Sequence, residues 1–155
     1  MHTNCEAVQA ILIAAGAPGR VRILDEAAPT AAAAAAQLGV DVGAIANSLI
    51  FATAEDEPLL VLTSGAHRVD TAKAAALVGT SGLRRAKPDF VLAATGQVIG
   101  GVAPVGHPAP IRTLVDQDLA GYPQIWAAGG IPHAVFPTTF AELVQLTGGT
   151  VAEVA

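Results

Sequence analysis

Glycine lies just beyond each helical segment that the sequence predicts. Because these glycines end the helices, the chain is limited to short helices separated by short strands. The predicted helices cover residues 4–15, 31–38, 71–78, 88–94 and 140–146, and glycines follow them at positions 16, 39, 79, 96 and 148. Glycine is favoured there because it adopts the left-handed conformation that ends a helix. The residues suited to starting helices are Thr30, Asp70, Pro88 and either Thr138 or Thr139.

Short apolar runs between these helices predict the strands. The runs cover residues 21–24, 45–53, 59–63, 111–115, 125–127 and 134–136. The polar turn at residues 55–58 joins two of them, which therefore form an antiparallel hairpin. No repeat, linker or low-complexity segment divides the chain, so we expect residues 1–155 to form one α/β domain with a mixed, largely antiparallel sheet.

The chain is acidic, with a formal net charge of −5, and this argues against a protein that coats nucleic acid. Seven of the eight lysines and arginines nevertheless precede residue 88. This uneven placement has two interpretations: a local basic patch that holds one strand end, or charges spread over solvated faces.

The composition also bounds the location and the chemistry of the protein. No uncharged run approaches the roughly 18–20 strongly hydrophobic residues that span a membrane, and the N-terminus lacks the features of a signal peptide, so we expect a cytoplasmic protein. Cys5, the only cysteine, is expected to be a small apolar residue. We expect no metal and no cofactor, because metal-binding spacing is absent among His2, His67, His107 and His133.

Residues 99–107 form a glycine-rich loop suited to binding through its backbone. Gly100, Gly101 and Gly106 allow positive φ or a close approach to a ligand, while Pro104 fixes one φ and removes one N–H. If the N–H groups of the three glycines converge, they form a donor site for a carbonyl, a carboxylate or an oxyanion. The alternative is a pair of tight turns that join strands.

Several motifs follow one another along the chain. They are Thr30 with six alanines and Gln37-Leu38-Gly39, residues 45–51 (IANSLIF), Gly65 with Asp70 and Lys73, Thr95-Gly96, residues 100–107 (GGVAPVGH), Asp116, Gly129-Gly130, and Ala141-Glu142-Leu143. This order resembles the YbaK/EbsC family of aminoacyl-tRNA editing (deacylase) domains, which is similar to the editing domain of bacterial prolyl-tRNA synthetases. The resemblance covers nearly the whole chain. It implies a mixed sheet curled towards a barrel, with a pocket between the sheet and its helices.

The resemblance further implies hydrolysis of the ester that joins a mischarged amino acid to the 3′ end of tRNA. Such an ester requires orientation, water or a substrate hydroxyl as nucleophile, and stabilisation of the oxyanion. This suits a chain that has no Ser-His-Asp order and no G-x-S-x-G motif. The expected partner is a tRNA acceptor end carrying an aminoacyl ester. The sequence specifies neither the tRNA nor the oligomeric state.

The site residues expected from this family fall into two groups. Gly100, Gly101 and Gly106 are the expected backbone donors, and His107 either assists the reaction or closes the loop through a backbone hydrogen bond. The expected substrate contacts are Thr30, Asn47, Ser48, Pro104, Gly129, Gly130 and His133, although Pro132 favours a plain turn around the last.

Asn47 departs from the family pattern, because this position is usually a lysine that contacts the substrate. Asparagine keeps two donors and one acceptor but carries no charge. Two functions therefore stand: a freestanding deacylase that acts in trans, or a non-catalytic module that binds an aminoacyl or nucleotide end. Strand alternation predicts that Asn47 faces the pocket on the same side as Leu49, opposite Ser48 and Ile50.

Overall fold

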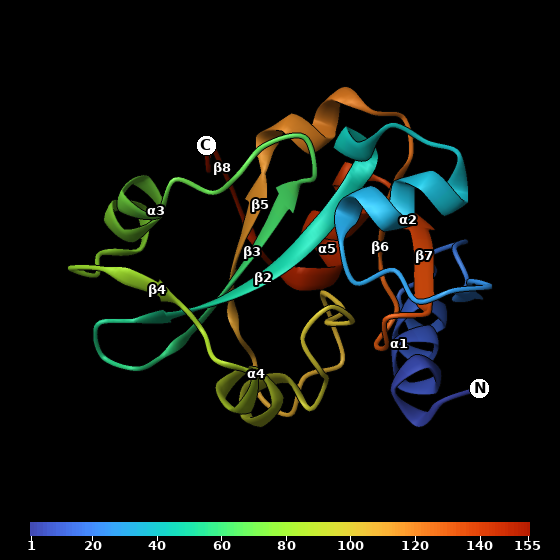
Figure 1. The fold of residues 1–155 in the computed structure, drawn as a ribbon, viewed down its shortest axis with the longest axis horizontal. Helices are drawn as coiled ribbons and strands as arrows, with labels where there is room; N and C mark the ends of the chain where they lie inside the picture. Colours follow the sequence, from blue (N-terminus) through green and yellow to red (C-terminus); the bar gives the residue numbers. More distant parts are fainter.

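A mixed sheet of eight strands forms the centre of the computed structural model, which describes residues 1–155 (Figure 1). The strands are β1 (Arg22–Ile23), β2 (Ile45–Thr53), β3 (Pro58–Ser64), β4 (Leu83–Arg85), β5 (Arg112–Asp116), β6 (Ile125–Ala128), β7 (Ala134–Thr138) and β8 (Thr150–Ala152). The helices are α1 (Thr3–Ala14), α2 (Ala31–Leu38), α3 (Thr71–Val78), α4 (Pro88–Thr95) and α5 (Phe140–Thr147). The predicted α/β class, with a mixed sheet flanked by helices, is confirmed.

Local capping explains why all five helices match the predicted ones to within one residue at each end. Thr30 Oγ1 accepts a hydrogen bond from Ala33 N at 3.2 Å, and Asp70 Oδ1 accepts one from Lys73 N at 3.1 Å. Thr139, rather than Thr138, caps α5. Left-handed glycines end the last four helices, with φ values of 67°, 75°, 72° and 63° at Gly39, Gly79, Gly96 and Gly148.

The sheet runs as an open path in the order β1-β7-β6-β2-β3-β5-β8, with β4 paired to β2 beside this path. Four strand pairs are antiparallel and three are parallel. The predicted hairpin is confirmed, since β2 and β3 pair from Ala46↔Ser64 to Ala52↔Pro58. The sheet does not close into a barrel, because its path ends at β1 on one side and at β8 on the other.

One edge of β2 is interrupted, and this interruption creates the site. Strand β2 pairs with β3 along most of its length, but its other edge pairs with β6 only at Ile45 and Ala46 and with β4 only from Phe51 to Thr53. Residues 47–50 therefore have no strand neighbour on that edge. A gap in the sheet results between the ends of β6 and β4.

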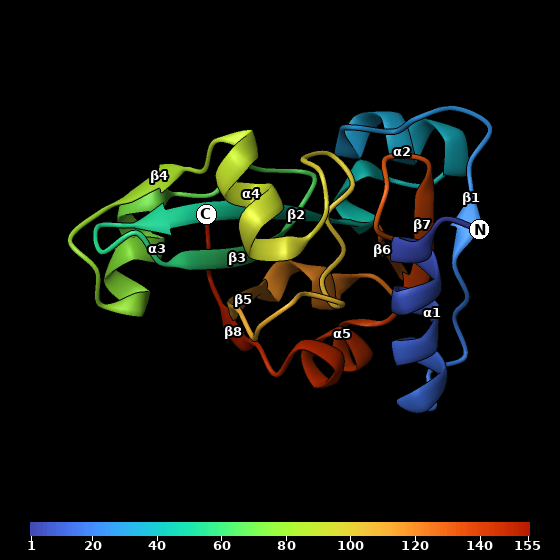
Figure 2. The same ribbon diagram turned by 90° about the horizontal axis from the view of Figure 1, so that it is seen from below.

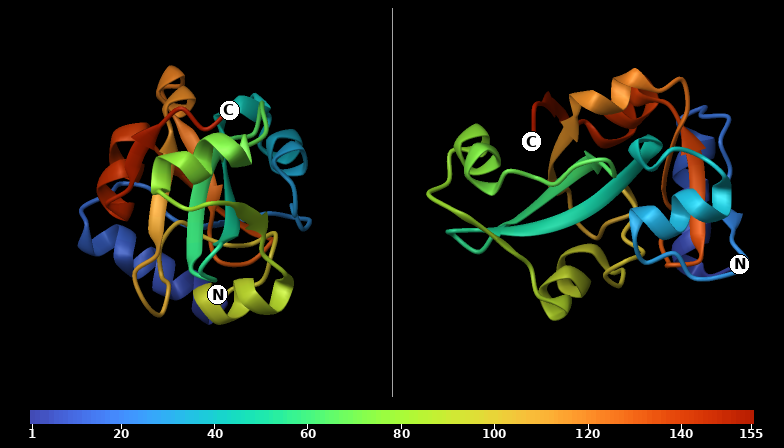
Figure 3. Two further views of the ribbon diagram at one scale, coloured as in Figure 1. Left: turned by 90° about the vertical axis from the view of Figure 1, so that its left-hand side faces the viewer. Right: turned by 45° about the horizontal axis from the view of Figure 1, so that its top comes forward.

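The helices cover different parts of the sheet. The largest apolar cluster includes Val8 and Leu12 of α1 and Leu143 of α5, while Ala34 of α2 and Ala74 of α3 belong to two smaller clusters. Helices α2 and α5 lie on opposite sides of the β2–β3 hairpin (Figure 2), and α3 lies at the far end of the molecule from α2 (Figure 3).

The N-terminal helix carries the single cysteine into the core. Cys5 is completely buried, as predicted, and this burial raises the pKa of its thiol. Helix α1 is the longest helix, with 12 residues, and none of the helices is long and apolar enough to span a membrane.

Candidate active site

A small cavity, here called the inner pocket, lies at the gap in the sheet. Its volume is about 40 Å³, and it is enclosed by residues of α2, β2, β6 and β7 together with Gly100 and Val102 of the glycine-rich loop. Most of the lining residues are apolar, and they include several alanines and Trp126 of β6. No residue of the lining carries an ionisable side chain.

Ser48 supplies polar groups to this pocket because of its place on β2. Ile50 O accepts a hydrogen bond from Ala86 N next to β4, whereas Thr53 N donates to Glu57 O on the β3 side. Since alternate residues of a strand direct their main-chain groups to the same edge, the N–H and C=O of Ser48 point into the gap. Its Oγ is also buried without a hydrogen-bond partner. An unpaired buried hydroxyl costs about 1–3 kcal/mol, so a ligand that pairs with it binds more favourably.

The glycine-rich loop does not bring its three glycine amides together, so the condition for a donor site built from all three is not met. Gly100 lines the inner pocket with φ of 88°, and its N–H has no acceptor in the protein. The Gly101 N–H instead donates to Val98 O at 3.1 Å. Gly106 lies at a separate surface cavity near α1 and α5. Val102, which also lines the inner pocket, likewise has an N–H with no acceptor in the protein.

Gly101 is required for packing. A Cβ at this position would lie 2.5 Å from Ile131 C and 2.6 Å from Pro132 N, which are backbone atoms of the β6–β7 connection. The loop can therefore approach this connection closely only with glycine at position 101.

Gln97, which the sequence analysis did not single out, holds the loop from inside. Its side chain is 3% exposed, and its Oε1 accepts a hydrogen bond from Ala103 N at 2.6 Å, while its Nε2 donates to Val105 O at 3.4 Å. Thr95 Oγ1 accepts from Gln97 N at 3.0 Å. The only available signal was a polar residue directly after the α4 glycine, which is too common to be specific.

His107 closes the same loop. Its Nε2 donates to Ala103 O at 2.8 Å, which is the loop-closing alternative named above. Burial lowers the pKa of the ring, and the hydrogen bond to Ala103 opposes this with a smaller effect. His107 and Pro104 line the surface cavity that contains Gly106, and neither lines the inner pocket.

The remaining predicted contacts divide into two sets. Thr30 and Asn47 line the inner pocket together with Ser48. Gly129 and Gly130 instead form the β6–β7 turn, where Gly129 N donates to Ala134 O and Gly130 O accepts from Asn4 Nδ2. His133 lies exposed in this turn and does not line the pocket.

A larger depression of about 560 Å³, here called the outer groove, continues from the inner pocket. Asn47, Ser48, Leu49 and Phe51 of β2 line it, so Asn47 and Leu49 border the same groove, but Ser48 borders it as well. Arg68 of the β3–α3 connection and Arg85 of β4 also line it. The groove therefore carries positive charge beside an inner pocket that carries none.

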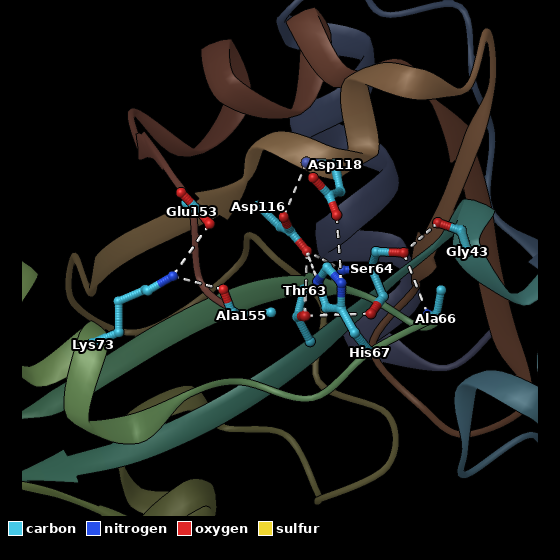
Figure 4. A network of polar contacts seen from close by, with 10 residues as sticks. All are labelled: Gly43, Thr63, Ser64, Ala66, His67, Lys73, Asp116, Asp118, Glu153 and Ala155. Atoms are coloured by element: carbon cyan, nitrogen blue, oxygen red, sulfur yellow. Dashed lines mark hydrogen bonds and ion pairs between the residues drawn. The ribbon is translucent and has the colours of Figure 1, made fainter.

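His67 lines the outer groove and is held from behind by two aspartates (Figure 4). Its Nε2 lies 2.5 Å from Asp116 Oδ2, and its Nδ1 lies 3.4 Å from Asp118 Oδ2. The three side chains are close enough to share a cation, with ligand atoms within 4.8 Å of one another. Asp116 Oδ2 already accepts a hydrogen bond from Ser64 N at 2.8 Å, so this network fixes the β3–α3 connection.

The fold and the pocket together define a small α/β domain that presents a small, mainly apolar pocket beside a basic groove. A sequence profile described as "Aminoacyl-tRNA editing domain" matches residues 25–146. The chain belongs to this family, which confirms the resemblance noted above, and the corresponding activity is that of an aminoacyl-tRNA deacylase, an ester hydrolase.

Individual relatives agree with this assignment. The uncharacterised protein YwhH of Bacillus subtilis (strain 168) is 30% identical over 114 residues, covering 74% of this chain and 72% of YwhH. A proline–tRNA ligase of Nitratidesulfovibrio vulgaris (strain DP4) is 33% identical over 110 residues, but these cover only 18% of that enzyme. A crystal structure described as a candidate trans-editing enzyme for prolyl-tRNA synthetase superposes with a TM-score of 0.91 and 42% identity, covering 99% of this chain and 98% of the other.

Proposed function

We propose that this chain hydrolyses, in trans, the ester of a short-side-chain amino acid attached to proline tRNA. The observation that carries this proposal is the inner pocket, which is apolar, small and bordered by unpaired peptide groups. The prolyl assignment is supported by the solved relative and by the similarity to proline–tRNA ligases. The acceptor end of the tRNA is the proposed partner.

The size of the inner pocket limits the amino acid. A bound water needs roughly 10–15 Å³ of such volume, so a cavity of about 40 Å³ holds about three waters. A side chain of one or two heavy atoms fits this space, whereas a leucyl side chain exceeds it. The proposed substrate is therefore an alanyl or similarly short aminoacyl ester.

The loop amides are proposed to stabilise the reacting carbonyl. Water adds to the ester carbonyl carbon and gives up a proton to the solvent, and the resulting oxyanion accepts hydrogen bonds from the N–H groups of Gly100 and Val102. The bond between the acyl carbon and the ribose oxygen then breaks, and the ribose oxygen takes up a proton from the solvent, which releases the free amino acid. Because the pocket lining has no ionisable side chain, catalysis comes from orientation and oxyanion stabilisation, without a protein general base.

Asn47 is proposed to position the substrate at the boundary between the two cavities. It lines both the inner pocket and the outer groove, and its amide makes no side-chain hydrogen bond within the protein. The NH₂ group of Asn47 donates a hydrogen bond to an ester or ribose oxygen placed there. The side-chain carbonyl oxygen of Asn47 accepts one from a ribose hydroxyl. One neutral hydrogen bond contributes about 0.5–1.5 kcal/mol, which corresponds to roughly ten-fold in rate at its upper end.

Deacylation of proline tRNA charged with alanine, proline or leucine tests this function. We expect turnover of the alanyl ester, little turnover of the leucyl ester, and a roughly ten-fold lower kcat/KM for alanine in Asn47→Ala. An unchanged kcat/KM in Asn47→Ala would remove Asn47 from the site. Equal hydrolysis of all three esters would refute selection by the inner pocket.

A binding module is the second candidate, and the absence of ionisable groups from the inner pocket favours it. Trp126 is the only tryptophan of the chain and lines the pocket, so its fluorescence reports occupancy directly. A fluorescence change with charged tRNA, combined with no turnover of any ester, would establish binding without catalysis.

A further inference from the structure

We propose that Arg68 and Arg85 bind phosphate groups in the single-stranded 3′ end of the tRNA as it lies in the outer groove. The proposal deepens the proposed function and rests on it for the identity of the RNA. Both side chains are exposed and line the groove. Neither takes part in any of the four ion pairs of the protein, so both are available to an anion.

The groove is basic although the protein as a whole is acidic. Its lining contains two arginines and His67 but no aspartate or glutamate, whereas the formal net charge of the chain is −5. The nearest acidic groups to His67 are Asp116 and Asp118, and both bind the imidazole ring. An anionic ligand is therefore attracted to this groove although the chain as a whole carries negative charge.

The two arginines line the groove from different elements. Arg85 pairs with Phe51 in the β2–β4 register, and its guanidinium carbon lies 5.9 Å from the centre of the Phe51 ring. The neighbouring Arg84 instead pairs with Asp56 and is not part of the groove lining. Arg68 directly follows His67, which Asp116 anchors.

Continuity with the inner pocket identifies the anion as a polynucleotide backbone. The two cavities share Thr30, Asn47, Ser48 and Gly100, so an aminoacyl group in the inner pocket leaves its ribose at this boundary. The nucleotides that precede this ribose must leave through the outer groove, which has a volume of about 560 Å³. A planar guanidinium binds two phosphate oxygens at once, which suits arginine to this role.

Calorimetric binding of an RNA hairpin with a single-stranded four-nucleotide 3′ end, at several salt concentrations, tests the proposal without requiring turnover. We expect Arg68→Gln and Arg85→Gln each to weaken binding about ten-fold. The slope of log K against log salt should become shallower by about 0.7 for each arginine removed. The matched control is Arg22→Gln, an exposed arginine of β1 with the same change of charge but outside the groove.

A blunt-ended hairpin distinguishes the single-stranded end from the duplex and should bind weakly to all variants. Unchanged binding in both groove variants, or equal weakening in Arg22→Gln, would overturn the proposal. Hydrolysis of 3′-O-alanyl adenosine, which has no phosphate, separates this result from the proposed function. Wild type, Arg68→Gln and Arg85→Gln should hydrolyse it equally. A wild-type protein that is inactive on every ester would refute the deacylase, and the phosphate-binding proposal would then be judged by the binding measurements alone.

Discussion

At the scale of single residues, His107 shows how a histidine near a glycine-rich loop serves structure. Burial lowers the pKa of its ring more than the hydrogen bond to Ala103 raises it. The ring is therefore neutral at pH 7, with Nε2 donating to the Ala103 carbonyl. Since His107 lines a surface cavity apart from the inner pocket, its removal should affect the fold more than the chemistry.

Acid should destabilise the protein in part through His107. Its folded pKa lies below the unfolded value of about 6.5, so the unfolded state binds more protons as the pH falls. The stability contributed by the neutral ring is complete above that value and is lost as the pH falls through the lowered folded pKa. Urea unfolding between pH 7.5 and 5 should show a smaller loss of stability in His107→Gln than in wild type. His133→Gln is the exposed control, and identical pH dependence in wild type and His107→Gln would contradict this role.

At the scale of elements, the glycine-rich loop depends on Gln97. Removing its amide in Gln97→Ala leaves the buried Ala103 N–H and Val105 C=O without partners, which should cost about 1–3 kcal/mol of unfolding free energy. Denaturant unfolding measures this cost, with the exposed Gln124→Ala as control. Equal stability of the two variants would show that the loop keeps its conformation without the hydrogen bonds of Gln97.

Helices and strands differed in how far the sequence could predict them. Thr30, Asp70 and the glycines just past the helices act locally, so the helix ends follow from sequence alone. Strands β4 and β8 have only three residues each, and they exist because β2 and β5 offer them an edge. Such pairing depends on tertiary context, which no short pattern of residues contains.

The candidate site was predictable in part for the same reason. Thr30, Asn47, Ser48 and Gly100 lie together at the inner pocket, in segments that the family resemblance had marked. The hydrogen bond from Gly101 N to Val98 O could not be foreseen, because it depends on how the loop folds back on itself. Arg85 reaches the same groove as Arg68 because β4 pairs with β2, and this pairing is not visible in the sequence. From the sequence, a basic patch was therefore only one of two interpretations of the uneven charge.

At the scale of the whole molecule, the interrupted edge of β2 organises the fold around one opening. The gap between β6 and β4 leaves the main chain of Ser48 without a strand neighbour. Alanines of α2 line the pocket at this gap, and the glycine-rich loop contributes Gly100 and Val102 to the same pocket. Alanine suits this helix face because a larger side chain would occupy the cavity. The proposed division of the substrate follows from this arrangement, with the aminoacyl group enclosed and the polynucleotide in the outer groove.

The single-turnover rate of alanyl-ester hydrolysis on proline tRNA, compared between wild type and Ala34→Leu, tests the assignment of the inner pocket most directly. Ala34 is 5% exposed and lines the pocket, so three added carbons should fill the cavity of about 40 Å³. Ala32 lies on the exposed face of the same helix, so Ala32→Leu is the matched control. We expect Ala32→Leu to keep the wild-type rate and Ala34→Leu to lose about ten-fold to two-hundred-fold while circular dichroism shows an intact fold. A folded Ala34→Leu variant that hydrolyses the ester at the wild-type rate would contradict the inner pocket as the site of the reaction.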